Sequence, residues 1–229
     1  MKLRRIAAVL LLILLSGCVH VRTPAESPTL RIYLARHGQT DWNLAHRLQG
    51  LTDTDLNETG RAQAHLLAGR LDGVTIDHVY SSALRRSRET AAIAEPGATV
   101  ESLPALNEHG LGKFEGFYRD GRDPATEQEY QRRYADENDP LDGGESMRQF
   151  TARVCGAVEQ IRKTRRSGSI LIVGHGGTNA AILRCILNLS AEQTALIQQN
   201  NDELYLIELS EAHPPKLWKL ITGDKLGEL

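Results

Sequence analysis

The sequence is poor in cysteine, nearly neutral in charge and free of any apolar run long enough to cross a membrane as a helix. Its 229 residues include 3 cysteines, and its 27 Lys and Arg are set against 29 Asp and Glu. A nucleic-acid-binding domain is expected to carry a clear positive excess, so we exclude nucleic acid as a partner. A chain of this length that is 41% apolar buries a sizeable core without help from disulfides or metals, and we expect one domain.

The N-terminal segment departs from these averages. Three basic residues precede an unbroken apolar run from Ile6 to Leu15. A membrane-spanning helix needs about 20 apolar residues, whereas a basic head followed by roughly 7 to 15 apolar residues is typical of an export signal. The run leads into Leu15-Ser16-Gly17-Cys18, which resembles the bacterial lipoprotein signal.

The lipoprotein resemblance implies a particular organisation of the chain. Residues 1–17 would be cleaved off, and Cys18 would become the lipidated first residue of the mature protein. Residues 18–29 contain two prolines and no periodic apolar pattern, so we expect a lipidated tether there. Residues 30–229 then form the folded domain.

Cleavage also changes the expected relation to a membrane. Because residues 1–17 carry three positive charges and no negative ones, the remaining 212 residues have a net charge of −5 instead of −2. An acidic body is not attracted to anionic lipid, so the acyl chains at Cys18 are expected to hold it. By resemblance to Gram-negative lipoproteins, Val19 in place of Asp after the cysteine implies transport to the outer membrane, on its periplasmic face. A plain signal peptide followed by an ordinary cysteine, and an uncleaved signal anchor, stay open as alternatives.

Export would place the other two cysteines, Cys155 and Cys185, in an oxidising compartment, where cysteines can pair. Each lies in a helix-like, largely apolar stretch, 153–161 and 180–189. A free cysteine in such a stretch commonly behaves as a small buried hydrophobe. We therefore expect two unpaired, buried thiols.

Apolar patterns along the rest of the chain alternate between strands and helices. Strands are predicted at the short β-prone runs 30–35, 78–80, 99–103, 169–173, 203–209 and 217–221. Helices are predicted, from apolar residues at helical spacing, over 60–71, 84–94, 145–163 and a stretch ending at Leu189. The polar segment 119–140 is predicted as a solvated insertion placed to form part of a lid. This alternation predicts an α/β fold, a three-layer α/β/α sandwich with a mostly parallel central sheet.

Three predicted strands end in polar clusters. These clusters are Arg36-His37-Gly38-Gln39-Thr40 with Asn43, Ser81-Ser82 leading to Arg86, and His175-Gly176-Gly177. Ligands of open α/β sheets bind beyond the carboxyl ends of the strands. Arginine forks match phosphate oxygens, and glycine lets backbone N–H groups approach them. The clusters together predict a site for a phosphoryl group.

These clusters resemble the motifs of the histidine phosphatase superfamily, in its phosphoglycerate-mutase-like branch. The matching segments, in family order, are LARHGQTDWN (34–43), LNETGRAQA (56–64), SSALRRSRET (81–90), LNE (106–108) with GKFEG (112–116), GES (144–146) and VGHGG (173–177). Six ordered blocks over about residues 30–210 make an accidental match implausible. The resemblance implies a phosphoglycerate-mutase-like fold.

The resemblance also implies a mechanism. His37 is the expected nucleophile, because an imidazole with a pKa of about 6.5 is largely neutral at pH 7 and can attack phosphorus to form a phosphohistidine. Glu108 is the expected acid for the leaving oxygen and then the base for the attacking water, with Glu115 as the alternative acid. The phosphoryl oxygens are expected to be held by Arg36, Arg86 and His175.

Further substrate contacts are expected from residues beside these motifs, namely Asn43, Gln39, Gln49, Gly50 and Gly176. His109 is expected at the rim of the site. No Asp or His cluster has the spacing of metal ligands, and each step uses side chains or backbone, so we expect neither a metal nor another cofactor.

Segment 119–140 bears on the reaction. The segment is shorter than the corresponding region of the cofactor-dependent mutases, and the family's phosphatases share this shorter length. The resemblance therefore favours hydrolysis of a small phosphorylated substrate over mutase transfer. The predicted function is therefore that of a lipid-anchored phosphomonoesterase of the cell envelope. A phosphoglycerate-type mutase and a non-catalytic lipoprotein that binds a phosphorylated ligand are the alternatives.

Overall fold

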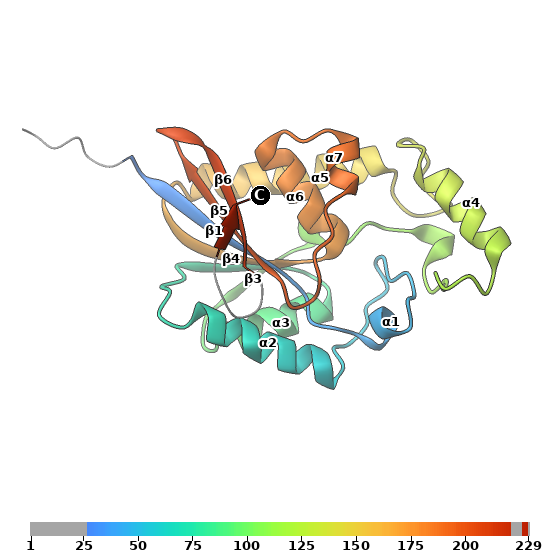
Figure 1. The fold of residues 1–229 in the computed structure, drawn as a ribbon, viewed down its shortest axis with the longest axis horizontal. Coiled ribbons are helices and arrows are strands. Elements are labelled where there is room, and N and C mark those ends of the chain that lie inside the picture. The colour runs from blue at the N-terminus through green and yellow to red at the C-terminus, as the bar shows by residue number, and fades with distance from the viewer. Residues whose placement is uncertain (1–26, 221–225, 229) are drawn as a thin grey trace, which may run out of the picture.

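The computed structural model describes residues 27–220 and 226–228, which form a seven-stranded sheet covered by helices on both faces (Figure 1). The strands are β1 (Thr29–Arg36), β2 (His78–Ser82), β3 (Val100–Leu103), β4 (Gly168–Gly174), β5 (Leu204–Ser210), β6 (His213–Leu220) and β7 (Leu226–Glu228). The helices are α1 (Asp41–Leu44), α2 (Glu58–Leu71), α3 (Arg85–Ala94), α4 (Pro124–Tyr134), α5 (Met147–Thr164), α6 (Gly176–Leu187) and α7 (Ala191–Ala195), with 3₁₀ turns at Pro104–Leu106 and Gly112–Phe114. The predicted signal segment and Cys18 lie outside the described residues.

The sheet has the order β3-β2-β4-β1-β5-β6-β7. Strands β3, β2, β4 and β1 pair in parallel, and β6 runs with them because it is antiparallel to β5, which is antiparallel to β1. Strands β1 and β4 end in register, since Arg36 pairs with Gly174. The residues that follow, His37 and His175, are thereby brought together, and the N–H of His37 donates to the carbonyl of Gly174 at 3.0 Å.

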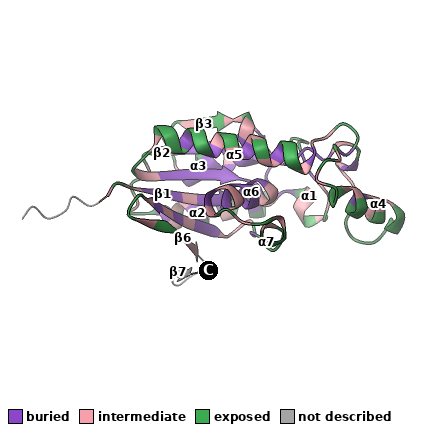
Figure 2. Cartoon of the chain, turned by 90° about the horizontal axis from the view of Figure 1, so that it is seen from above, coloured by how far each residue is buried: buried purple, intermediate pink, exposed green. Residues whose placement is uncertain are grey.

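Helices α5 and α6 cover one face of the sheet, and α2 and α3 cover the other (Figure 1). Alternate side chains of β4 pack on opposite faces of the sheet. Ile170 and Ile172 belong to the core on the side of α5 and α6, and Leu171 and Val173 to the core on the side of α2 and α3. A strand that is apolar on both faces is typical of a sheet centre. Figure 2 shows the buried strands between helices whose outer sides are exposed. The predicted α/β/α sandwich is confirmed.

Segment 119–140, predicted as a solvated insertion, is mostly exposed as expected, and the structure adds that it contains helix α4. The helix projects beyond the sheet, at the end that also carries α1 (Figure 1). Its Tyr130 is only 6% exposed and packs with Leu111, Phe114 and Leu141 in a small core of its own. Tyr130 is the one buried side chain between residues 119 and 140, so the segment is largely solvated but is anchored to the domain by this ring. Helix α7 was also missed.

Cys155 and Cys185 form a disulfide, so the expectation of free thiols was wrong. The two Cα atoms lie 5.5 Å apart, and the bond joins α5 to α6. Both stretches are helical as predicted, but the cysteines face each other across the contact between the helices and are only half-buried. The spacing of apolar residues cannot reveal this pairing, because it contains no distance between two helices.

None of the helices within residues 27–220 is long and apolar enough to span a membrane.

Candidate active site

The carboxyl ends of β1, β2 and β4 meet at one edge of the sheet and bring the predicted phosphate-binding residues together. His37 follows β1, His175 follows β4, and Arg86 lies in the first turn of α3 after β2. All three side chains are buried, with exposures of 2%, 0% and 0%. The two imidazole rings lie 5.0 Å apart between centroids. Sequence motifs separated by more than half the length of the chain therefore form one cluster.

The imidazole of His37 is held in the form that a nucleophile requires. Its Nδ1 lies 2.7 Å from the carbonyl of Gly38, which can only accept, so Nδ1 carries the proton and Nε2 keeps its lone pair. Burial, and then the positive charges of Arg86 and Arg36, hold the pKa of His37 well below its ordinary value. The ring is consequently neutral at pH 7.

Arg86 is held by three acceptors of the protein. Its Nη1 donates to the carbonyl of Thr52 at 2.8 Å, its Nη2 to the carbonyl of Gly50 at 2.9 Å, and its Nε to Nδ1 of His175 at 3.3 Å. Burial lowers the pKa of Arg86 to about 10, against the raising effect of Glu108 and other carboxylates. The guanidinium remains charged at neutral pH and is fixed in direction.

Both ring nitrogens of His175 are occupied. Nδ1 accepts from Arg86, so Nε2 carries the proton and donates to Oγ of Ser82 at 2.7 Å. Burial and then the charge of Arg86 hold the pKa of His175 well below its ordinary value. In this arrangement His175 orients Arg86, and its expected contact with a phosphoryl oxygen stays a prediction.

Arg36 differs from Arg86 in that its buried Nε has no hydrogen-bond partner among the described residues. Its Nη1 donates to the carbonyl of Gln199 at 2.7 Å. A buried donor without a partner is costly, so the Nε atom marks a place that suits an anion. The guanidinium lies beside Gly176 at the start of α6, where a Cβ would come within 3.6 Å of its Cζ.

Glu108 lies at the N-terminus of α6. Its carboxylate accepts from the N–H groups of Gly177 at 3.0 Å and Thr178 at 3.1 Å, and from its neighbour His109 at 2.9 Å. A Cβ at Gly177 would come within 2.6 Å of Oε1, so a side chain there would displace the carboxylate. Glu108 and Arg36 thus contact adjacent residues of the same helix start.

Glu115, the alternative acid, is engaged elsewhere. Its carboxylate accepts from the N–H groups of Leu51, Thr52 and Leu111 and from the hydroxyl of Thr52, at 2.6 to 3.2 Å. It holds the loop whose carbonyls bind Arg86. This geometry favours Glu108 as the acid.

The flanking residues that were expected to contact substrate have mainly structural partners. The amide oxygen of Asn43 closes the capping box of α1, that of Gln39 accepts from Asn57 at the start of α2, and that of Gln49 accepts from Thr54 at 2.6 Å. Gly50 has a φ of 52° and leaves room for Glu115. Their contacts with substrate, like that of Gly176, stay predictions.

His109 does not lie at the rim. It is 4% exposed, its ring stacks on Phe150 at 4.8 Å between centroids, and its Nε2 lies 2.7 Å from the carbonyl of Glu145. Burial lowers its pKa. The expectation was wrong because a histidine next to a loop carboxylate gives no indication of which way it points.

Close backbone contacts explain other residues of the motifs. A Cβ at Gly38 would come within 2.3 Å of the carbonyl oxygen of Gly60, and one at Gly60 within 2.1 Å of that of Gln39. Thr90 accepts from the N–H of Gly38 at 3.0 Å and donates to the carbonyl of Arg86 at 2.7 Å. These contacts lock the loop after β1 against α2 and α3.

Two supporting residues were not predicted. Gln199 supplies the carbonyl that binds Arg36, and its buried amide bonds to the carbonyl of Leu34 at 2.9 Å. Asn201 donates to the carbonyl of His37 at 2.6 Å. Both lie in a polar stretch after α7 that has no motif or periodicity to mark it.

The arrangement suits the binding and transfer of a phosphoryl group. A neutral imidazole faces two arginines, and a carboxyl group lies at the adjacent helix start. Fixed positive donors of this kind stabilise the charge of a phosphoryl transition state. Within the described part of the chain, no group of three His, Cys, Asp or Glu is arranged to hold a metal ion.

Comparison with known proteins agrees with the fold and the site. The model of the histidine phosphatase superfamily (branch 1) matches residues 32–219. The "Probable phosphoglycerate mutase GpmB" of Yersinia pestis (strain Pestoides F) is 33% identical over 186 residues, which cover 80% of this chain and 86% of that protein. This chain therefore belongs to the histidine phosphatase superfamily and has phosphoglycerate-mutase-like relatives.

Solved structures of phosphatases share this fold. The alpha-ribazole phosphatase of Shigella flexneri superposes with a TM-score of 0.71 at 26% identity, over 79% of this chain and 91% of that one. A mycobacterial glucosyl-3-phosphoglycerate phosphatase in complex with VO3 gives 0.72 at 29% identity, over 82% and 96%. The chain is accordingly a histidine phosphatase, a phosphoric monoester hydrolase.

Proposed function

We propose that this protein is a lipid-anchored phosphomonoesterase that hydrolyses a small phosphate ester through a phosphohistidine on His37. The observation that carries the proposal is the state of His37, which is a buried, neutral ring with Nδ1 bonded to Gly38 and Nε2 unprotonated. The named activities of the structural neighbours, on alpha-ribazole phosphate esters and glucosyl-3-phosphoglycerate, support a small phosphorylated substrate.

The first chemical step transfers the phosphoryl group to the enzyme. Nε2 of His37 forms a bond to phosphorus while the bond from phosphorus to the leaving oxygen breaks, and the protonated carboxyl of Glu108 gives its proton to that oxygen. Arg36 and Arg86 neutralise the charge on the phosphoryl oxygens. The alcohol then departs.

The second step returns the enzyme to its starting state. The Glu108 carboxylate takes a proton from water, whose oxygen attacks phosphorus, and the bond from phosphorus to Nε2 breaks. The products are inorganic phosphate and neutral His37. The carboxyl group is again protonated, so the cycle balances with one water consumed.

The chemistry is tested by trapping the intermediate. The full chain, purified in detergent, is mixed with phosphate-labelled p-nitrophenyl phosphate and quenched in base, in which phosphohistidine survives. Label on the protein that is absent from His37→Ala, together with phosphate release that EDTA does not abolish, is expected. Turnover in His37→Ala equal to wild type, or complete loss in EDTA, would refute the mechanism. Isomerisation of 3-phosphoglycerate would show a mutase, and binding without labelling would show a non-catalytic protein.

The anchoring is supported by different observations. The basic head, the apolar run and Leu15-Ser16-Gly17-Cys18 support export and lipidation. The Cys155–Cys185 disulfide fits an oxidising compartment such as the periplasm. Incorporation of a palmitate analogue into the wild-type chain but not into Cys18→Ser, with the label in the outer-membrane fraction, is the expected result. Equal labelling of both proteins would refute the anchor.

A further inference from the structure

The motif Gly144-Glu145-Ser146 takes no part in the chemistry above, yet its Gly144 and Glu145 contact the loop that follows Glu108. A Cβ at Gly144 would come within 2.2 Å of the carbonyl oxygen of Gly110, so only glycine permits this close approach. The N–H of Glu145 donates to the same carbonyl at 2.8 Å. Ser146 caps α5, with Gln149 completing the capping box. The motif thus packs the start of α5 closely against the loop that follows Glu108.

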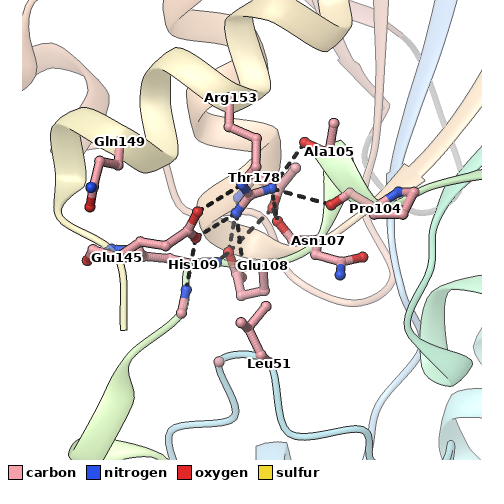
Figure 3. Close-up of polar contacts among 12 residues, drawn as sticks. Leu51, Pro104, Ala105, Asn107, Glu108, His109, Glu145, Gln149, Arg153 and Thr178 are labelled. Carbon is pink, nitrogen blue, oxygen red and sulfur yellow. Dashed lines mark hydrogen bonds and ion pairs between the residues drawn. The ribbon is translucent and has the colours of Figure 1, made fainter. Parts of the chain in front are cut away.

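Arg153, two turns along α5, binds the segment that leads into Glu108 (Figure 3). Its Nη1 donates to the carbonyls of Ala105 at 3.0 Å and Asn107 at 3.1 Å, and its Nη2 to the carbonyl of Glu108 at 3.3 Å. The guanidinium therefore fixes the backbone immediately before and at Glu108.

Glu145 orients Arg153. Its two carboxylate oxygens accept from Nε at 2.8 Å and from Nη2 at 2.6 Å, which is the paired geometry that suits an arginine fork. One of them also accepts from the N–H of Gly110 at 3.2 Å. Burial opposes ionisation of Glu145, yet the bonds from Arg153 and Gly110 leave its pKa below the ordinary value. Both side chains are about three-quarters shielded from solvent, at 24% and 23% exposure.

Helix α6 completes the enclosure of Glu108. The hydroxyl of Thr178 donates to the carbonyl of Asn107 at 3.1 Å, and the N–H groups at the helix start hold the carboxylate. The side chain of Glu108 is thus held by α6 and its backbone by Arg153 of α5. Figure 3 shows these contacts converging on the loop from both helices.

We infer that Arg153, held by Glu145, is a positioning residue that sets the direction of the Glu108 carboxyl toward the leaving oxygen. The inference rests on the proposed function, in which Glu108 is the acid. A displacement of about 1 Å in a reacting group can cost roughly 10²-fold in rate. Loss of the Arg153 fork frees three carbonyls of residues 105–108, so the backbone that carries Glu108 can shift while the α6 N–H groups still hold the carboxyl. His37 and Arg86 keep all of their contacts.

This role predicts a dependence on the leaving group. A nitrophenolate departs without needing a proton, whereas the alkoxide of an alkyl ester does not. Misplacing the acid therefore slows hydrolysis of an alkyl phosphate more than that of p-nitrophenyl phosphate. A residue that only stabilises the fold affects both substrates equally.

The experiment measures kcat/KM on p-nitrophenyl phosphate and on glycerol 2-phosphate for the full-length chain. We expect Arg153→Met to lose about 10²-fold on glycerol 2-phosphate and less than about 5-fold on p-nitrophenyl phosphate. Arg153→Lys and Glu145→Gln should show the same discrimination with smaller losses. Glu108→Gln should show it most strongly, and adding Arg153→Met to Glu108→Gln should cost little more on glycerol 2-phosphate, because residues that act as one unit are not additive.

Arg162→Met is the matched control. Arg162 is an exposed arginine in the last turn of the same helix, so both substrates should be hydrolysed at wild-type rates. Thermal melts establish that each variant is folded. If Arg153→Met does not fold, Glu145→Gln carries the same prediction, since it keeps the shape of the side chain and removes its charge.

Equal losses on the two substrates, or losses that multiply in the double variant, would overturn the positioning role. Failure of the proposed function looks different, because the wild-type chain then forms no phosphohistidine or Glu108→Gln itself shows no discrimination between leaving groups. Phosphohistidine in the wild type, discrimination in Glu108→Gln and none in Arg153→Met would refute the role of Arg153 alone.

Discussion

The two halves of the candidate site are held in place by different means. The strand-end half consists of Arg36, His37, Arg86 and His175, which lie at or just beyond the carboxyl ends of the parallel strands. The first three bond to backbone carbonyls, and His175 bonds to the side chains of Arg86 and Ser82. The loop half, residues 104–145, carries Glu108 and is held by α5, α6, close glycine contacts and surface ion pairs. In the proposed mechanism, the sheet therefore fixes where a phosphoryl group binds, while the packing of helices on a loop fixes where the leaving-group proton lies.

The largest effect is expected from removing a donor of the strand-end half. Arg86→Met should lower kcat/KM on p-nitrophenyl phosphate by about 10³-fold, because it removes a charged donor from the phosphoryl oxygens. It also leaves the carbonyls of Gly50 and Thr52 and Nδ1 of His175 without their donor. Arg88→Met, on an exposed position of the same helix, is the control and should match wild type. A loss of less than about tenfold in Arg86→Met would mean that the strand-end half does not bind phosphate as described.

The next effect concerns the disulfide, which joins the helix that supports the loop half to the helix that begins at the strand-end half. It links residues 30 apart in sequence, and a loop of that length is expected to contribute about 3–4 kcal/mol to the free energy of unfolding. Replacing both Cys155 and Cys185 by Ser should therefore lower stability in urea by about this amount. Turnover at 25 °C should stay within about twofold, because Arg153 and the start of α6 keep their own contacts.

Reductant gives the control for the disulfide. It should destabilise the wild-type chain to the level of the double serine variant and leave that variant unchanged. A difference below about 1 kcal/mol between oxidised and reduced chains would show that α5 and α6 stay together without the bond.

Titration of the buried histidines is expected to have a smaller effect, and chiefly in the strand-end half. The pKa values of His37 and His175 are lowered in the folded chain, so below the ordinary value of 6.5 the unfolded chain binds protons that the folded chain does not. Above pH 6.5 both histidines are neutral in the folded and the unfolded chain, so they do not oppose folding. Below pH 6.5 protonation favours the unfolded chain, and the free energy of unfolding decreases. Between pH 6.5 and 5.5 each should reduce the free energy of unfolding by about 1 kcal/mol.

Urea unfolding at several pH values checks this. His175→Asn should show a shallower loss of stability on acidification than wild type, and His65→Asn, on an exposed position of α2, the same loss as wild type. His109 in the loop half also has a lowered pKa, so His109→Phe is expected to remove a further part of the slope. Identical slopes in His175→Asn and wild type would contradict the account.

The strand-end half could be predicted from sequence because each of its residues follows an apolar run that ends abruptly. Parallel strands bring their carboxyl ends to one edge, so the order of motifs alone places Arg36, His37 and His175 together. The register of β1 with β4 makes that placement exact, since Arg36 pairs with Gly174.

The loop half could not be predicted in the same way. The motifs name Glu108 as the expected acid but leave Glu115 open as the alternative, and only the fold turns Glu115 toward the backbone of Leu51 and Thr52. The pairing of Cys155 with Cys185 depends likewise on how α5 rotates against α6. Both outcomes rest on contacts between elements distant in sequence, and neither apolar periodicity nor motif spacing records them.

The smallest effect on turnover is expected at the outer part of the loop half, where ion pairs hold α4 to the residues on either side of it. Arg133 of α4 bonds to Asp139 at 2.7 Å and to Asp142 at 2.6 Å, and Lys113 joins Asp142 to Glu129. Arg133 and Asp139 are largely shielded, at 13% and 18% side-chain exposure, but Glu108 is held by α5 and α6 and not by α4. Arg133→Met should therefore change turnover of p-nitrophenyl phosphate by no more than about twofold.

Hydrogen exchange distinguishes this local role from a wider one. In Arg133→Met, amides of 124–142 should exchange faster, because the pairs that fasten α4 to the turn before α5 are gone, while those of β1, β4 and α6 should exchange as in wild type. Lys163→Met removes an exposed ion pair of α5 with Glu159 and serves as the control, with no change in 124–142. Faster exchange that reaches α6, or a loss of turnover comparable to that of Arg153→Met, would show that the position of Glu108 depends on α4 as well.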